Sequence, residues 1–168
     1  MLSAVSETVK TMPDGPRYDD DFFAWTQHQA AVLRSMAVTD NRFDRENVAE
    51  EIESLGRSER DAVRSQIRRI IEHLMKLSYS PARQPRFDWM ASIAEARSSL
   101  GDKISPTLQQ DAETMLARLY RDGRRQAELA LRGHGENQAA DALPHHCPYS
   151  LDDILRENWY PEPPGEQP

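Results

Sequence analysis

Residues 44–80 read DRENVAEEIESLGRSERDAVRSQIRRIIEHLMKLSYS, and this stretch decides the fold class of the 168-residue chain. Its apolar residues recur mostly at steps of three and four, which is the spacing of one face of an amphipathic helix. Asp44 suits the N-cap position, and Phe43 just before it can pack onto a residue one turn into the helix. We therefore predict a helix whose core-facing stripe is Val48, Ile52, Leu55, Val63, Ile67, Ile70, Leu74 and Leu77.

The middle of this stretch carries a pattern of helix-ending residues. An unbroken helix over 44–80 would be about 55 Å long, which is long for one small domain. Gly56 is typical of a helix end, and Ser58, with Asp61 three residues later, is typical of the cap of a new helix. The sequence therefore predicts a break or bend near Gly56.

The rest of the chain also shows helical spacing. Apolar residues follow it over 19–38, 89–100 and 105–133, and Ser150 with Asp153 can cap a last short helix. No stretch alternates apolar and polar residues as a strand would. We predict an all-α fold: a compact antiparallel bundle of four to five helices, with a short C-terminal helix packed across it. The first, second and fourth of the long helices are expected to run antiparallel to one another.

Composition limits the class of protein. Leu, Ile, Val and Phe fill 31 of 168 positions beside a net charge of −7, which is close to the limit for forming a core. No apolar run approaches the roughly 20 residues of a membrane span, and one cysteine cannot form an internal disulfide. The first residues lack the pattern of a secretion signal, so we expect a cytoplasmic protein. We expect a flexible arm over 1–17, a single helical domain over 18–160 and a disordered proline-rich tail over 161–168.

Four blocks in order carry a resemblance to a known family. They are YDDDFFAWTQHQ at 18–29, ENVAEEIESLGRS at 46–58, HLMKL at 73–77 and CPYSL at 147–151. Together they resemble the bacterial family catalogued as domain of unknown function number 29, from about Tyr18 to Pro161. The resemblance implies a small all-helical protein. It implies no activity, cofactor or catalytic residue.

The polar face of the second predicted helix changes sign along its length. Six acids against two arginines lie in 40–56, and eight basic residues against three acids lie in 57–86. The acidic part stacks Glu46, Glu50 and Glu53 on one side of the helix. A metal site of the helical-bundle type also needs a Glu-x-x-His pair, and Ile70 stands three residues before His73. We therefore expect a solvated polar face.

The basic part leaves three interpretations open. Arginines in a row can bind phosphates, which would make this a nucleic-acid interface, although few aromatic residues lie among them. They can instead pair within the chain, and Glu53 with Arg57 and Asp61 with Arg64 are well spaced for it. Two copies placed antiparallel would also set acidic half against basic half. The candidate nucleic-acid residues are Arg57, Arg60, Arg64 and Arg68, and the candidate partner-binding residues are Glu46, Glu50, Glu53, Arg57 and Arg60.

One cluster has metal-like chemistry: His134, His145, His146 and Cys147. Neighbours in an extended segment point to opposite sides, and a Cys–His nucleophile pair would lack an orienting acid. We expect the segment Cys147-Pro148-Tyr149 to anchor the last helix by packing, His73 to be a partly buried structural residue, and no metal or cofactor to be bound.

The sequence contains no phosphate-binding loop and no nucleophile motif, so we assign no catalytic residue. The leading hypothesis is a non-catalytic cytoplasmic interaction module that binds itself or a helical partner through the second helix. One alternative is a nucleic-acid-associated protein using the arginine stripe, although nucleic acid is not the partner we expect. Another is an enzyme with a carboxylate or His/Cys site.

Overall fold

The computed structural model describes residues 15–37, 39–101 and 103–165. It contains six helices: α1 (Phe22–Ser35), α2 (Arg45–Tyr79), α3 (Arg86–Gly101), α4 (Pro106–Gly133), α5 (Asn137–Asp141) and α6 (Leu151–Leu155). No strand occurs among these residues, so the all-α prediction is confirmed. The predicted arm over 1–17 falls almost entirely outside the described residues, as do the last three residues of the tail.

Helix α2 is continuous over 35 residues, so the predicted break near Gly56 is wrong. Gly56 is buried against α1, where an added Cβ would collide with Thr26 Oγ1. The glycine is therefore explained by the close approach of two helices and not by a turn. Asp44 caps the helix as expected, and its side chain accepts a hydrogen bond from Asn47 N at 3.2 Å.

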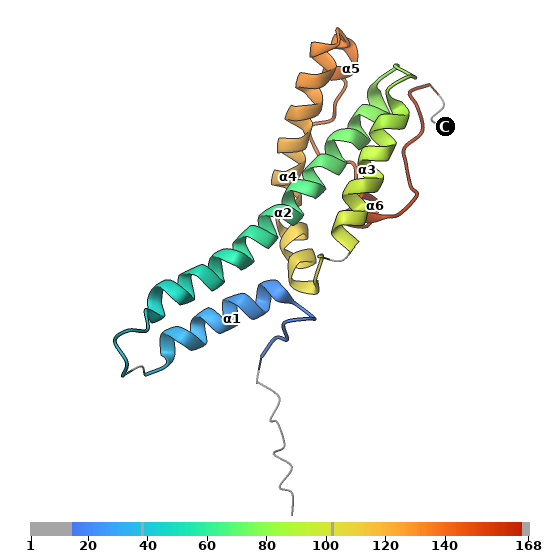
Figure 1. Ribbon diagram of the computed structural model, residues 1–168. Helices are drawn as coiled ribbons and strands as arrows, with labels where there is room; N and C mark the ends of the chain where they lie inside the picture. The colour runs from blue at the N-terminus through green and yellow to red at the C-terminus, as the bar shows by residue number, and fades with distance from the viewer. Residues whose placement is uncertain (1–14, 38, 102, 166–168) are drawn as a thin grey trace, which may run out of the picture.

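The other long helices pack on different parts of α2 (Figure 1). Helix α1 runs antiparallel to the N-terminal half of α2, and α3 runs antiparallel to the C-terminal half. Helix α4 runs parallel to α2, because Arg64 contacts Asp111 while Gly123, further along α4, lies against Ile71. The predicted antiparallel course of this helix is therefore wrong. Helix α3 brings the chain back along α2 in the opposite direction, so the next helix, α4, runs in the same direction as α2.

The core lies around the C-terminal half of α2. Val63, Ile67, Ile70, Leu74 and Leu77 are all at most 2% exposed, as predicted, and they pack with residues of α3, α4 and the C-terminal segment. The same stripe is not buried in the N-terminal half. There Val48 is 36% exposed and Leu55 is 57% exposed.

The C-terminal segment crosses the bundle, as the sequence predicts. Leu151 and Ile154 of α6 are buried, and the Ser150 side chain caps this helix by accepting from Asp153 N. Arg97 of α3 is only 7% exposed and donates to the carbonyl oxygens of Ile154 at 2.9 Å and Trp159 at 2.8 Å. This one side chain thus ties α3 to the segment that follows α6.

Beyond that segment, Pro161 accepts a hydrogen bond from Arg86 at 3.3 Å. Within the part of the chain that the structure describes, no helix has both the length and the apolar character to cross a membrane.

Candidate interaction surface

Helix α1 and the N-terminal half of α2 form a helical hairpin, residues 22–57, whose internal contact is made of small side chains. Thr26 and Ala30 are the buried residues of α1, Ala49 and Gly56 are buried in this part of α2, and Thr26 lies directly against Gly56. The Thr26 hydroxyl donates to Phe23 O at 2.7 Å, which satisfies it within its own helix. Small residues let the two backbones approach closely, but they bury little apolar area.

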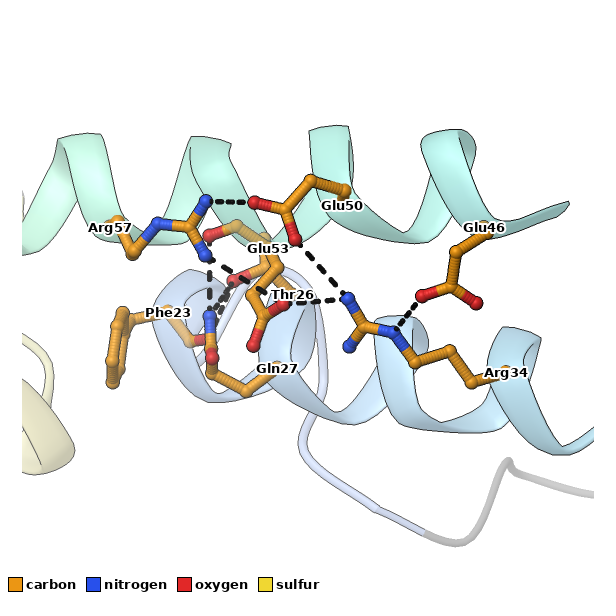
Figure 2. A network of polar contacts seen from close by, with 8 residues as sticks. All are labelled: Phe23, Thr26, Gln27, Arg34, Glu46, Glu50, Glu53 and Arg57. Atoms are coloured by element: carbon orange, nitrogen blue, oxygen red, sulfur yellow. Dashed lines mark hydrogen bonds and ion pairs between the residues drawn. The ribbon is translucent and has the colours of Figure 1, made fainter. Parts of the chain in front are cut away.

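A polar network covers one flank of the hairpin (Figure 2). Arg34 of α1 lies at its centre and contacts Glu46 at 2.9 Å, Glu50 at 3.4 Å and Glu53 at 2.9 Å. Arg57 contacts Glu50 at 2.6 Å and Glu53 at 3.7 Å. Hydrogen bonds from Arg34 to Glu53 and Glu46 raise the pKa of the Arg34 guanidinium. The three glutamates are therefore satisfied inside the chain.

The remaining arginines of the predicted stripe are mostly paired as well. Arg64 donates to both carboxylate oxygens of Asp111, at 2.8 and 2.6 Å, and this hydrogen bonding raises the pKa of Arg64. Arg60 pairs with Asp61 at 3.1 Å. Arg68 donates to Ser65 at 3.3 Å and is the one of the four with no carboxylate partner among the described residues.

The two pairs expected from spacing alone are also present: Glu53 with Arg57, and Asp61 with Arg64 at 4.0 Å. Arg57, Arg60 and Arg64 thus each hold a carboxylate before any ligand arrives.

The opposite flank of the hairpin is apolar. At 100° per residue, Val48 and Leu55 lie about 90–110° to one side of the direction in which Ala49 and Gly56 face α1. The glutamates and Arg57 lie a similar angle to the other side. We call the apolar side the apolar flank, and its residues are Tyr18, Phe22, Trp25, Val32, Met36, Val48, Ile52 and Leu55.

Exposure on the apolar flank is high for residues of this size. Val32 is 37% exposed, Met36 is 49% exposed and Leu55 is 57% exposed. A large apolar side chain presents up to about 150–200 Å², so the exposed members together leave on the order of 400 Å² uncovered. Patches of this kind mark interaction sites in many soluble proteins.

Three aromatic rings gather at the base of the apolar flank. The ring centroid of Tyr18 lies 5.3 Å from that of Phe22 and 4.8 Å from that of Trp25, both edge to face. Phe22 and Trp25 stack at 6.0 Å. Tyr18 is 56% exposed, so the cluster adds accessible Tyr and Trp surface of the type that anchors protein interfaces.

The His/Cys residues lie elsewhere. His145, His146 and Cys147 line a surface pocket of about 500 Å³ against Tyr120 and Arg121 of α4. His134 caps the end of α4 and is not part of this pocket. Within 15–37, 39–101 and 103–165, no three His, Cys, Asp or Glu side chains come close enough to share a metal ion.

The Cys147 thiol is half-buried and lies close to Tyr149. It donates to Tyr149 O at 3.2 Å, and its burial raises its pKa, which keeps it protonated and poorly nucleophilic at neutral pH.

His73 lies in the interface between α2 and α3, where its Nε2 is 3.0 Å from Ser92 Oγ. Burial, together with the charge of Lys76, lowers the pKa of His73 to about 4. A neutral imidazole without an acid partner at Nδ1 serves as a packed structural residue.

Sequence reasoning missed Arg34 and Thr26, which organise the hairpin. The signal for them was present as small residues, at 26 and 30 in one helix and at 49 and 56 in the other. These positions indicate where backbones can meet, and a cation one helical turn beyond them can reach the glutamates.

The likeness of this chain to other proteins agrees with its architecture. A crystal structure of an alpha-helical protein of unknown function from Rhodospirillum rubrum superimposes with a TM-score of 0.76 at 28% sequence identity. The match covers 85% of this chain and 91% of that one. No curated protein matches the sequence. The model of the family described as domain of unknown function DUF29 matches residues 17–160, and the chain therefore belongs to that family.

Proposed function

We propose that this chain is a non-catalytic protein-interaction module and that its binding face is the apolar flank of the helical hairpin. One observation carries the proposal. The hairpin places small residues between its helices and large apolar residues on its outside, the reverse of what a free-standing hairpin needs. A helix of 14 residues with two buried side chains gains little from its own contacts. Covering the apolar flank would supply the missing burial.

The proposed binding face of the second helix is its apolar side and not the charged side considered from the sequence. The acidic and basic residues first considered for partner binding form the polar network with Arg34 or other internal pairs. A partner contacting that side would have to displace hydrogen-bonded carboxylates. The apolar flank carries no such cost, because its exposed side chains have only water to displace.

The same pairing weakens the nucleic-acid alternative. A phosphate would have to compete with the carboxylates that already hold Arg57, Arg60 and Arg64. The alternative is testable through Arg68, whose change to Glu breaks no internal ion pair. Binding of labelled nucleic acid that falls steeply with salt and is lost in Arg68→Glu would favour it over our proposal.

We also place the module in a bacterial cytoplasm. Support comes from its similarity to a Rhodospirillum rubrum protein and from the single cysteine, which is a free, half-buried thiol suited to a reducing compartment.

Site-specific photo-crosslinking in the native host tests the binding face. A photoreactive phenylalanine analogue is placed at Leu55 of the apolar flank or at Leu129 of α4, which is 61% exposed and serves as the matched control. We expect a discrete crosslinked product from position 55 and none from position 129, with mass spectrometry identifying the captured chain. The absence of a product at 55, or equal products at both positions, would contradict the proposal.

A further inference from the structure

We infer that the occupant of the apolar flank is a second copy of this chain, packed antiparallel about a two-fold axis near Ile52. This inference rests on the proposed function and specifies the partner. Three properties of the hairpin support it: the area of the apolar flank, its helical geometry and the charges beside it.

The area of the apolar flank fits a homodimer of standard size. Such an interface buries roughly 800 Å² per copy, of which somewhat more than half is apolar. The exposed apolar residues leave on the order of 400 Å² uncovered, which supplies most of the apolar part. The polar rim would come from the ends of the hairpin.

The geometry of the hairpin fits a four-helix arrangement. Two helices side by side present a two-helix layer, and a second such layer turned over on the first closes a four-helix core. With the axis near Ile52, the α2 helices of the two copies lie antiparallel, and Val48 of one copy falls within a turn of Leu55 of the other. Symmetry then brings α1 of one copy onto α1 of the other, with the aromatic cluster of one copy towards the hairpin tip of the other.

Charges beside the apolar flank are complementary under this symmetry. Arg45 and Glu59 each lie seven residues from Ile52, one on either side, and both project between the apolar flank and α1. An antiparallel two-fold arrangement therefore sets Arg45 of each copy opposite Glu59 of the other. Within the chain, Arg45 donates to Met36 O, and Glu59 forms no ion pair among the described residues. The dimer would supply the carboxylate and the cation that each lacks.

The oligomeric state of the full chain tests the inference. Sedimentation velocity over about a hundredfold range of concentration should show a monomer–dimer equilibrium that follows mass action. Leu55→Glu should weaken association at least about tenfold, because the dimer would bury that charge, while the monomer already exposes the position. Leu129→Glu, at an equally exposed site on α4, should leave association unchanged. Unchanged circular dichroism and thermal melting of each variant, measured at a concentration where it is monomeric, confirm folding.

Charge reversal tests the register. Arg45→Glu and Glu59→Arg should each weaken the dimer about tenfold. Combining the two changes in one chain should restore it, because the positions that face each other across the dimer then carry opposite charges again. The two positions are 14 residues apart on one helix, so repair within a single chain cannot explain a rescue. Lack of rescue, with both single variants folded, would overturn the antiparallel register.

A chain that stays monomeric over the whole range would overturn the second-copy inference. If the photoreactive residue at 55 then captures a different protein, the proposed function stands and only the identity of the partner is wrong. If it captures nothing, the proposed function fails as well. A dimer dissociated equally by Leu55→Glu and Leu129→Glu would place the interface elsewhere and overturn the inference.

Discussion

Gly56 lies where α1 and α2 pack closely together, and the contact depends on the absence of a side chain at this position. A Cβ there would collide with Thr26 Oγ1, whose hydroxyl is fixed by its bond to Phe23 O. Helix propensity alone would favour alanine over glycine in the middle of a helix. The packing requirement overrides that preference at this one residue.

We therefore predict that Gly56→Ala destabilises the protein by about 1–3 kcal/mol, as overpacking of a tight contact does. Gly133→Ala is the matched control, because its added Cβ would meet no atom within 4 Å apart from its chain neighbours and the backbone of its own helix. The control should be neutral or stabilise by up to about 1 kcal/mol through the lower entropy of the unfolded chain. Urea denaturation measures both, and the Thr26→Ala, Gly56→Ala double variant should recover part of the loss. Equal effects at the two glycines would contradict the packing explanation.

His73 makes stability depend on pH. Its pKa is lowered from 6.5 to about 4 in the folded protein, by burial first and then by Lys76 and Arg69, while the carboxylate of Glu72 acts in the opposite direction. The unfolded chain thus binds more protons than the folded one between about pH 4 and 6.5. Stability from this residue is complete above pH 6.5 and is lost as the pH falls to about 4.

A fully buried group with this shift would contribute about 3 kcal/mol, and partial exposure of the ring reduces that to about 1–2 kcal/mol. Because carboxylates titrate in the same range, the measurement compares the free energy of unfolding of the wild type with that of His73→Gln at pH 7 and pH 4.5. We expect the wild type to lose about 1–2 kcal/mol more than the variant. Parallel pH profiles would show that His73 does not titrate as described.

At the scale of elements, Arg97 holds the C-terminal segment on the bundle. It is almost fully buried, and the guanidinium donates to the carbonyls of Ile154, Trp159 and Asp153 and lies 5.5 Å from the Tyr160 ring. Burial lowers its pKa, but the group stays charged at any physiological pH.

Arg97→Met should cost about 2–4 kcal/mol, because it leaves buried carbonyl groups without donors. It should also speed hydrogen exchange in residues 151–160 before the rest of the chain. Arg69→Met is the control, since its side chain is 43% exposed and contacts Ser92 and Glu95 near the surface. That change should cost less than about 1 kcal/mol. A similar loss in both variants would argue against Arg97 as the anchor of the segment.

The helices are the part of the structure that could be predicted best from the sequence. Helical periodicity located every long helix, because the 3.6-residue repeat is a local property. It also placed Ile67 and Leu74 correctly in the core. Periodicity could not distinguish a core position from a surface position at Val48 and Leu55, because burial there depends on which other helix packs against α2 and on which side.

The predicted helix break at Gly56 was wrong for a related reason. A glycine at a close contact between helices and a glycine at a helix end cannot be told apart in a single sequence. The sequence alone identifies only part of the candidate surface: the helix that carries it, but not the face. The sequence points to the charged face of the second helix, and it cannot show that Arg34, on another helix, pairs with the glutamates of that face.

For the whole molecule, the division of α2 between two sets of partners predicts uneven stability. The C-terminal half lies among α3, α4 and α6, whereas the N-terminal half contacts mainly α1. Native-state hydrogen exchange of monomeric Leu55→Glu should show the slowest amides in 63–77 and exchange at least about tenfold faster in α1. Equal protection of α1 and 63–77 would contradict this division. If the wild type forms the proposed dimer, α1 should gain protection as its concentration rises, and the core amides should change little.

The unbroken length of α2 has a mechanical consequence. A straight helix of 35 residues spans about 52 Å and resists bending, so it acts as a lever whose pivot is the packed end. A small tilt of α2 at the core would move the hairpin tip through a much larger arc. A force applied at the tip would in turn be transmitted to the side chains packed around Ile70. The rigidity of α2 would therefore hold the tip of the hairpin at a fixed distance from the core.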